Sequence, residues 1–323
     1  MIIAYLSKER LLSHEITQEN IALLSEAVWI DLIYPTREEE LLLKLQLGLD
    51  TPTREKMQEI ELSSRLYKHK EALFMTAAMI AQSESPEPVT DAVTFILTKH
   101  QLVTIRYIEP QAFKLFIAQL YNYDFVHNHA ATILIELLEA TVDRLADILQ
   151  LISHHLDEFS KLIFRPGIKA GVEEKPNYEE FIQQIGANAD LNTMARECLM
   201  TFSRLIPFFG QSMELENEGQ TRLGTLSKDV SSLSDHATFI SNKVNFLLDA
   251  TLGFINIEQN ATIKIFSVAA VIFLPPTLIA SIYGMNFTYM PELHFRGGYY
   301  VAIVLMFLSA LIPYRLFKRK KWL

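Results

Sequence analysis

Gly284, Met285 and Asn286 stand near the end of the chain, and together they offer an unusual backbone and a neutral side-chain amide. Gly284 can end a helix with a left-handed or otherwise unusual backbone, and Asn286 presents an amide oxygen beside the exposed carbonyls of that helix end. A ring of neutral oxygens can accept hydrogen bonds from the water shell of a cation, which suits Mg²⁺ because this ion loses its waters reluctantly. Several copies around a symmetry axis could form such a ring, whereas a single copy is simply a helix cap and turn.

The residues before this group place polar side chains on one side of a helix. At about 100° per residue, one third of the circumference collects Asn260, Ile263, Phe266, Ser267, Ala270, Leu274, Thr277 and Ser281. The opposite side is apolar and carries Ile265, Val268, Ile272 and Ile279. The polar face can line a pore or pack closely against a neighbouring helix. Pro275 and Pro276 remove two backbone donors, so this helix is expected to bend or loosen midway.

Two apolar runs around the group predict a membrane hairpin. Residues 265–282 contain no ionisable side chain, and their length matches the ~20 residues that cross a bilayer. A second run, 297–312, follows after a short connection. The tail after it is basic, which marks the cytoplasmic side, through Arg315, Lys318, Arg319, Lys320 and Lys321. With two spans, both termini are expected in the cytoplasm and residues 283–296 outside.

The first part of the chain has an α/β pattern. Short β-branched or aromatic runs predict strands at 27–33, 72–81, 92–98 and 102–107, with a hairpin turn at 99–101. Thr36 and Glu39 form a capping box for a helix that Gly48 can end, and Thr51-Pro52 predicts the start of another. After Pro110 the apolar residues recur at helical spacing, from Ile133 to Leu156 in one long segment that residues 165–177 break, and a second helix is predicted over about 178–205.

The last soluble element is expected to be a long stalk helix that continues into the membrane. No proline interrupts residues 221–274, and a stripe at steps of three or four begins at Val230 and reaches Phe254. Such a stripe needs partners, and symmetric self-association is the simplest source of them. The predicted organisation is therefore an α/β domain with a helical extension over 1–215, a stalk over 216–260 and a two-helix pore domain over 261–323.

Composition and motifs argue against several other classes of function, namely nucleic-acid binding, transport driven by ATP and metal-dependent catalysis. The net charge of −9 disfavours nucleic acid as a partner, and Cys198 is the only cysteine, as expected in a reducing cytosol. No phosphate-binding loop is present, so transport driven by ATP is not expected. A membrane-tethered cytosolic enzyme or scaffold is an alternative, but the histidines at 127, 129, 154 and 155 lack the spacing of a metal centre.

Residues 283–293, "YGMNFTYMPEL", with "KIFSVAAVIFLPPTLIAS" before them and "FKRKKWL" at the end, closely resemble the CorA family of magnesium and cobalt transport proteins. The likeness is detailed over 242–323 and looks most like the proteobacterial members. It implies an α+β fold with a cytosolic αβα domain, a stalk helix continuing into the first of two spans, and a homopentameric channel in the bacterial inner membrane. The ZntB zinc transporters also carry a Gly-Met-Asn group and are the alternative within this superfamily.

The resemblance also assigns roles to residues. Gly284, Met285 and Asn286 would form the selectivity filter, with Asn286 holding Mg²⁺ through its hydrating waters. The pore-lining residues would be Asn260, Ile263, Phe266, Leu274 and Thr277. Asp229, Asp235 and Asp249 are candidates for regulatory Mg²⁺ sites, although a solvated helix face explains them equally well. Glu292 would lie in the outer loop, where the neighbouring His294 and Arg296 oppose its charge.

The ligands and surroundings that the resemblance implies are few. Mg²⁺ would be the transported ion and also the regulatory one, with Co²⁺ and then Ni²⁺ as secondary ions, and no other cofactor is expected. Membrane lipids would contact a basic collar made by Lys264 and the tail.

Overall fold

The structure is a computed structural model that describes residues 1–7, 11–59, 61–122, 129–164, 177–286, 290 and 297–320. The chain divides into two compact units, Met1–Leu248 and Asp249–Leu323. One helix, α8 (Asn217–Tyr283), contributes to both units. The boundaries that the sequence suggests after residues 215 and 260 stay predictions.

The first unit is built on a seven-stranded sheet with the order β2-β1-β3-β7-β6-β5-β4. The strands are β1 (Ile2–Ser7), β2 (Leu11–Glu15), β3 (Trp29–Ile33), β4 (Leu66–His69), β5 (Ala72–Ala81), β6 (Val89–Leu97) and β7 (Leu102–Arg106). Among the described strands, β3 and β7 alone pair in parallel, with Ile30 opposite Val103, and the other neighbours are antiparallel. Every residue of β5 and β7 is buried, as expected for strands covered on both faces.

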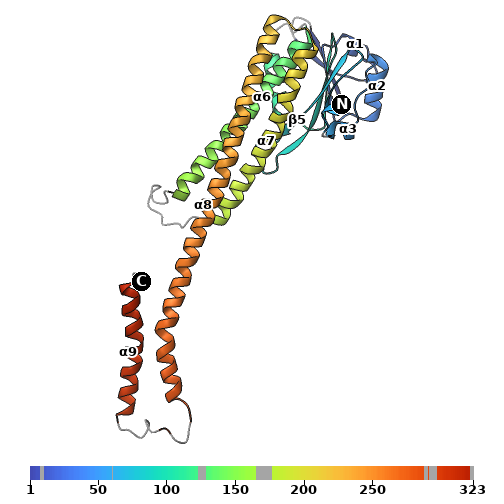
Figure 1. Ribbon diagram of the computed structural model, residues 1–323. Coiled ribbons are helices and arrows are strands. Elements are labelled where there is room, and N and C mark those ends of the chain that lie inside the picture. Colours follow the sequence, from blue (N-terminus) through green and yellow to red (C-terminus); the bar gives the residue numbers. More distant parts are fainter. Residues whose placement is uncertain are drawn as a thin grey trace. The chain divides into compact units, whose positions relative to one another are not determined.

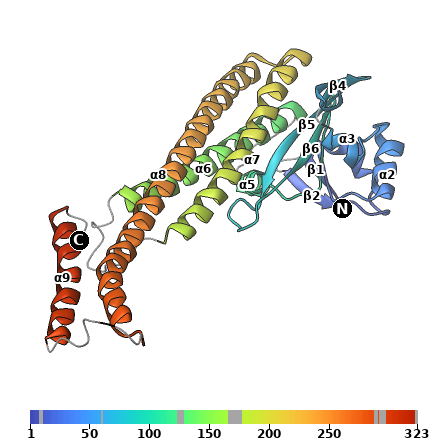
Figure 2. The same cartoon turned by 60° about the horizontal axis from the view of Figure 1, so that its bottom comes forward.

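Helices cover both faces of this sheet (Figures 1 and 2). One layer contains the short helices α1 (Leu23–Glu26), α2 (Arg37–Leu47) and α3 (Arg54–Gln58), whose Leu24, Leu43 and Met57 share one core cluster. The helix α4 (Leu62–Arg65) contacts α3, β4 and β5. The other layer contains α5 (Gln111–Asn122), α6 (Ala130–Phe164), α7 (Tyr178–Ser212) and the first part of α8. The predicted αβα arrangement of this part is confirmed.

The predicted strands and the first predicted helix are confirmed, since each rests on a local signal. In α2 the Thr36 hydroxyl accepts the Glu39 amide at 3.3 Å and the Glu39 carboxylate accepts the Thr36 amide at 2.9 Å. Gly48 follows in the left-handed region, with φ of 66°. The β6–β7 hairpin also forms as predicted. β1, β2 and β4 were not predicted, because their short runs are decided by pairing with neighbouring strands.

Two predicted helix ends are wrong. The start of α3 is not capped by residue 51, because Thr53 is the N-cap and its hydroxyl accepts the Lys56 amide at 3.4 Å. Pro52 therefore precedes the cap instead of standing in the first turn. The helix expected to end at residue 205 continues as α7 to Ser212, through Pro207. Burial of Phe209 beyond that proline holds the last turns in place.

The apolar stripe of α8 packs within its own chain over the part that belongs to the first unit. Val230, Ala237, Ile240, Val244 and Leu247 are buried. The Asn192 amide of α7 donates to the Ala237 carbonyl at 3.0 Å, and Lys243 pairs with Asp157 of α6 at 2.7 Å. The expectation that this part needs a second copy to bury its stripe is therefore wrong, because α6 and α7 cover it. A homo-oligomer stays a prediction on other grounds.

Carboxylates of α6 surround a single arginine of α8. Arg222 donates its Nε to Glu139 at 2.9 Å, and its Nη1 lies 3.8 Å from Glu136. Burial raises the pKa of Glu136 to about 6, with Arg222 opposing this shift and Glu139 adding to it. The folded protein thus binds this proton more tightly than the unfolded chain does.

Replacing Glu136 by glutamine is expected to remove part of the pH dependence of stability. Because the folded pKa is about 6 and the ordinary value is 4.5, this group adds stability as the pH falls through that window and loses it as the pH rises. The glutamine variant should lack this slope and gain at most about 1 kcal/mol at pH 7, since the side chain is partly exposed. Thermal unfolding between pH 4.5 and 7 measures it, with the exposed Glu158→Gln as control. An unchanged slope in Glu136→Gln would contradict the assignment.

Candidate functional site

The second unit contains the second half of α8, from Asp249 to Tyr283, and the antiparallel helix α9 (Gly298–Arg319), which runs alongside it (Figure 1). Both helices are long and apolar enough to cross a membrane, with mean hydropathies of 2.2 and 1.9 over their most apolar windows. α8 stays helical through Pro275 and Pro276 to Tyr283, and the predicted bend stays a prediction. The Thr277 hydroxyl donates to the Phe273 carbonyl at 2.7 Å, a side-chain bond to the preceding turn that is common for threonine within a helix.

The face of α8 that collects the polar residues is the face left open by α9. Every member is exposed, namely Asn260, Ile263, Phe266, Ser267, Ala270, Leu274, Thr277 and Ser281. The opposite stripe is less exposed, through Val268, Ile272 and Ile279, although Ile265 remains 69% exposed. On α9 the less exposed positions recur at the matching helical spacing, at Ala302, Met306 and Ala310. Close packing against α9 therefore does not account for the polar face.

Gly284 ends α8 without a left-handed backbone, so that part of the expectation is wrong. The Gly284 amide donates to the Ala280 carbonyl oxygen at 3.0 Å and lies 3.2 Å from the Ser281 carbonyl oxygen. The φ angle of Gly284 is not positive. Glycine matters here through space, since a Cβ would stand 3.2 Å from the Ala280 oxygen. Asn286 follows as an exposed residue whose amide has no hydrogen-bond partner within the described part of the chain. Its oxygen and nitrogen are free to meet water.

Comparison with known proteins connects this geometry to a family. Residues 25–319 match the family model described as "CorA-like Mg2+ transporter protein". The chain belongs to the CorA family. Over 318 residues, 98% of each chain, it is 35% identical to the "Magnesium transport protein CorA" of Salmonella typhimurium. The enzyme and scaffold alternatives lose their support, because this family is one of transporters.

Solved structures share the fold of this CorA-family chain. The complete structure of the CorA magnesium transporter from Methanocaldococcus jannaschii aligns with 100% of this chain and with 99% of the transporter's own chain. The TM-score is 0.73 and the sequence identity is 19%. The cytoplasmic domain of ZntB from Vibrio parahaemolyticus aligns with 79% of this chain and with 97% of the ZntB chain. The TM-score is 0.56 and the sequence identity is 11%. The fold is thus common to both branches, and the closer sequence likeness is to CorA.

The acidic residues singled out on α8 do not meet within one chain of this CorA-family protein. Asp229, Asp235 and Asp249 are all exposed, and Asp235 and Asp249 stand roughly 20 Å apart along the helix axis. Among the described residues, no group of three or more histidine, cysteine or acidic side chains could hold a metal ion. A regulatory site built from these residues would need ligands from another copy.

Asp229 nevertheless has an acidic neighbour that the sequence analysis missed. Burial raises the pKa of Asp143 on α6, and the charges of Glu139, Asp147 and Asp229 raise it further. These α6 residues recur at steps of three or four, beginning at Glu136, so helical spacing alone could have revealed them. Asp229 therefore lies within electrostatic reach of Asp143, and among the described residues no such acidic neighbour is found for Asp235 or Asp249.

His154 and His155 contact ordinary side chains of the helical layer and are not grouped with other metal-binding residues in the described part of the chain. His155 shares a hydrogen bond of 3.1 Å with Asn188 of α7, and His154 stands 3.9 Å from Glu158 on its own helix. Positions 127 and 128 lie outside the described residues, as do Glu292, His294 and Arg296. The outer-loop assignments stay predictions.

Replacing Gly284 by alanine is expected to reduce cation uptake by about tenfold or more while leaving the first unit folded. The added Cβ would press on the Ala280 carbonyl at 3.2 Å, so the backbone that presents Asn286 must shift. Ion flux in vesicles measures the effect. Gly253→Ala is a matched control, because a Cβ there meets nothing within 4 Å. Normal flux in Gly284→Ala would show that the close approach at this turn is not needed.

Proposed function

We propose that this chain forms a homopentameric channel that takes up Mg²⁺ across the bacterial inner membrane, with Co²⁺ and Ni²⁺ as secondary ions. The observation that carries the proposal is the exposed, partly polar face of α8, which leads to Gly284 and Asn286 in a chain of the CorA family. The names of its curated relatives support Mg²⁺ as the ion. Both termini would lie in the cytoplasm.

Selection would take place at the turn after α8. Several Asn286 amides around one axis would accept hydrogen bonds from the waters of the ion, together with backbone carbonyls at Gly284 and Met285. Removing those waters is costly for Mg²⁺, so neutral oxygens that leave the shell intact favour passage over tight binding. The flow would follow the electrochemical gradient, helped by ~2.3 kcal/mol per charge per 100 mV of membrane potential.

The same face of α8 would form the pore wall below the filter. Thr277 and Asn260 supply polar groups, while Ile263, Phe266 and Leu274 supply large exposed apolar side chains. Rings of such apolar groups can close a pore by excluding water, so Leu274 and its neighbours would form the constriction.

Intracellular Mg²⁺ would regulate the channel through acidic residues of the cytosolic part. Asp229 is the best supported of the candidates, because Asp143 of α6 lies within its electrostatic reach. A divalent cation would relieve the repulsion between such carboxylates. Asp235 and Asp249 would take part only through facing residues of neighbouring copies.

Lipid contacts would hold the hairpin at both interfaces. Tyr299 and Tyr300 are strongly exposed at the start of α9, which suits the aromatic belt of a membrane surface. Lys318, Arg319 and Lys320 end the same helix, and Lys264 lies near the start of the apolar part of α8. Together these cations would face the anionic cytoplasmic leaflet.

Ion flux into proteoliposomes tests the proposal directly. Purified full-length protein is expected to admit Mg²⁺ and, more weakly, Co²⁺, and to restore growth of a Mg²⁺-transport-deficient host at low Mg²⁺. Zn²⁺ flux without Mg²⁺ flux would favour the ZntB-like alternative and refute the main one. Turnover of a substrate by the fragment 1–215 would be needed to revive the enzyme alternative.

A further inference from the structure

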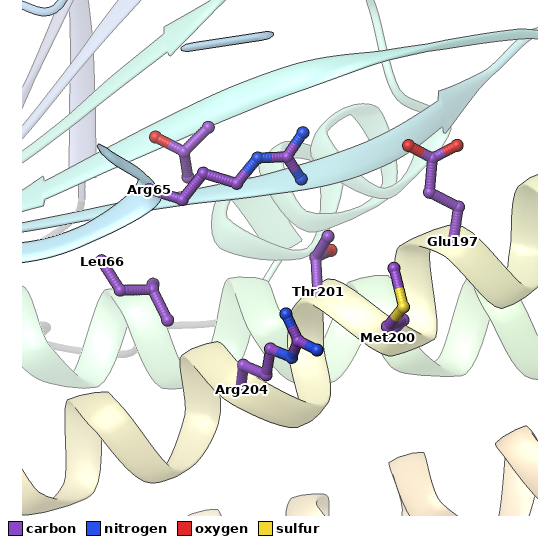
Figure 3. Close-up of a pocket in the computed structure, with 7 residues that line it drawn as sticks. Arg65, Leu66, Glu197, Met200, Thr201 and Arg204 are labelled. Atoms are coloured by element: carbon purple, nitrogen blue, oxygen red, sulfur yellow. The ribbon is translucent and has the colours of Figure 1, made fainter. Parts of the chain in front are cut away.

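A cavity of about 260 Å³ lies in the first unit, between α7 and the edge of the sheet (Figure 3). It exists because β4 pairs with β5 only from Ala72 to Met75, so the next part of the β5 edge faces α7 instead. Most of the surface that lines the cavity is made of carbon atoms, although several of the residues carry polar ends. The lining residues are Arg65, Leu66, Thr76, Glu197, Met200, Thr201 and Arg204. None of these residues belongs to the proposed ion pathway.

The hydroxyl groups of this cavity are already used by the protein. The Thr201 hydroxyl accepts the Ala78 amide at 3.1 Å and donates to the Cys198 carbonyl at 2.8 Å. The Thr76 hydroxyl lies 2.8 Å from that of Thr94. A ligand would therefore find its polar partners elsewhere in the lining.

Two guanidinium groups supply those partners. Arg65 donates its Nε to the Glu59 carbonyl at 2.6 Å, which fixes the group and leaves both terminal nitrogens without a hydrogen bond in the described part of the chain. Arg204 makes neither a hydrogen bond nor an ion pair with any described residue. Figure 3 shows Arg204 turned from α7 toward Thr201, and Arg65 extending from the opposite wall. Glu197 also lines the cavity but is not ion-paired with either arginine.

We propose that this cavity binds a small organic anion, with an oxyanion head on Arg65 and Arg204 and an apolar body against Leu66 and Met200. The planar fork of a guanidinium matches the geometry of carboxylate and phosphate oxygens, and burial of the apolar body adds to the affinity. Because the Glu197 carboxylate also lines the cavity, it would repel a second negative group, so the ligand should carry its negative charge at one end only. Because α4 and β4 form one wall and α7 the other, an occupied cavity ties these elements together.

Phenyl phosphate is a suitable probe, tested by titration calorimetry and thermal unfolding of the full-length protein in detergent. We expect one saturable site per chain and a raised melting temperature. Arg204→Gln and Arg65→Gln should each weaken binding by about tenfold or more, because each removes charge-assisted hydrogen bonds. Arg196→Gln is the matched control, since Arg196 lies two turns earlier on α7 and contacts Ser241 of α8. Inorganic phosphate and phenol should each bind more weakly than phenyl phosphate.

Several results would overturn the proposal. These are no binding of phenyl phosphate, equal affinity in both glutamine variants and the wild type, or equal affinity for inorganic phosphate or phenol. If a glutamine variant loses its helical circular dichroism, Arg204→Lys and Arg65→Lys replace it. Each is expected to bind at an intermediate affinity, because the charge remains and the fork is lost. Mg²⁺ flux is a separate measurement, so the outcome does not depend on the proposed transport.

Discussion

Replacing Asn286 by alanine is expected to abolish Mg²⁺ uptake, with flux reduced at least a hundredfold while the oligomer still assembles. The amide is exposed and has no hydrogen-bond partner in the described part of the chain, so its loss should cost the fold little. It would, however, remove the neutral oxygen that each copy would offer to the hydrated ion in the proposed ring. The effect should exceed that of Gly284→Ala, because alanine at position 286 removes the amide itself, whereas alanine at position 284 only displaces the turn that carries it.

Two measurements separate this result from a general loss of structure. Flux in proteoliposomes gives the activity, and size-exclusion chromatography in detergent gives the assembly. Asn242→Ala is the matched control, since this asparagine is also exposed on α8 but belongs to the first unit. Normal Mg²⁺ flux through Asn286→Ala would remove Asn286 from the mechanism.

Replacing Arg106 by methionine is expected to destabilise the first unit by about 3–5 kcal/mol, a large share of the stability of a typical domain. Arg106 is buried at the end of β7 and binds the buried Asp31 of β3, with Nη2 to Oδ2 at 2.9 Å. Its Nη1 donates to the Ile108 carbonyl at 3.0 Å, and its guanidinium lies 4.8 Å from the centre of the Phe113 ring. Methionine would leave the Asp31 carboxylate buried, with Thr104 as its one remaining side-chain donor among the described residues.

Thermal or denaturant unfolding measures this loss, and a second variant identifies its cause. The double variant Asp31→Leu with Arg106→Met removes both charges, so it should recover most of the stability that the single variant loses. Lys44→Met is the control, because Lys44 pairs with Asp50 on the surface, where such pairs contribute at most ~1 kcal/mol. A single variant as stable as the wild type would show that this buried pair is dispensable.

The sequence by itself determined the features that depend on neighbours along the chain. The capping box at Thr36, the strand runs and the membrane-length helices all arise from spacing of a few residues, and the structure bears them out. The exposed face of α8 was also predictable, because helical periodicity fixes which side chains share a side. The Gly-Met-Asn group could be located for the same reason, but its symmetric ring came only from the family resemblance.

Only the tertiary structure decided what each face meets, since periodicity does not identify the partner. The stripe from Val230 to Leu247 was expected to need a second copy, but α6 and α7 of the same chain bury it. The approach of Ala280 explains Gly284, and the field around Asp143 sets Asp229 apart from the other acidic candidates. The cavity with Arg65 and Arg204 joins residues more than a hundred positions apart, a juxtaposition that long-range packing creates and local spacing cannot specify.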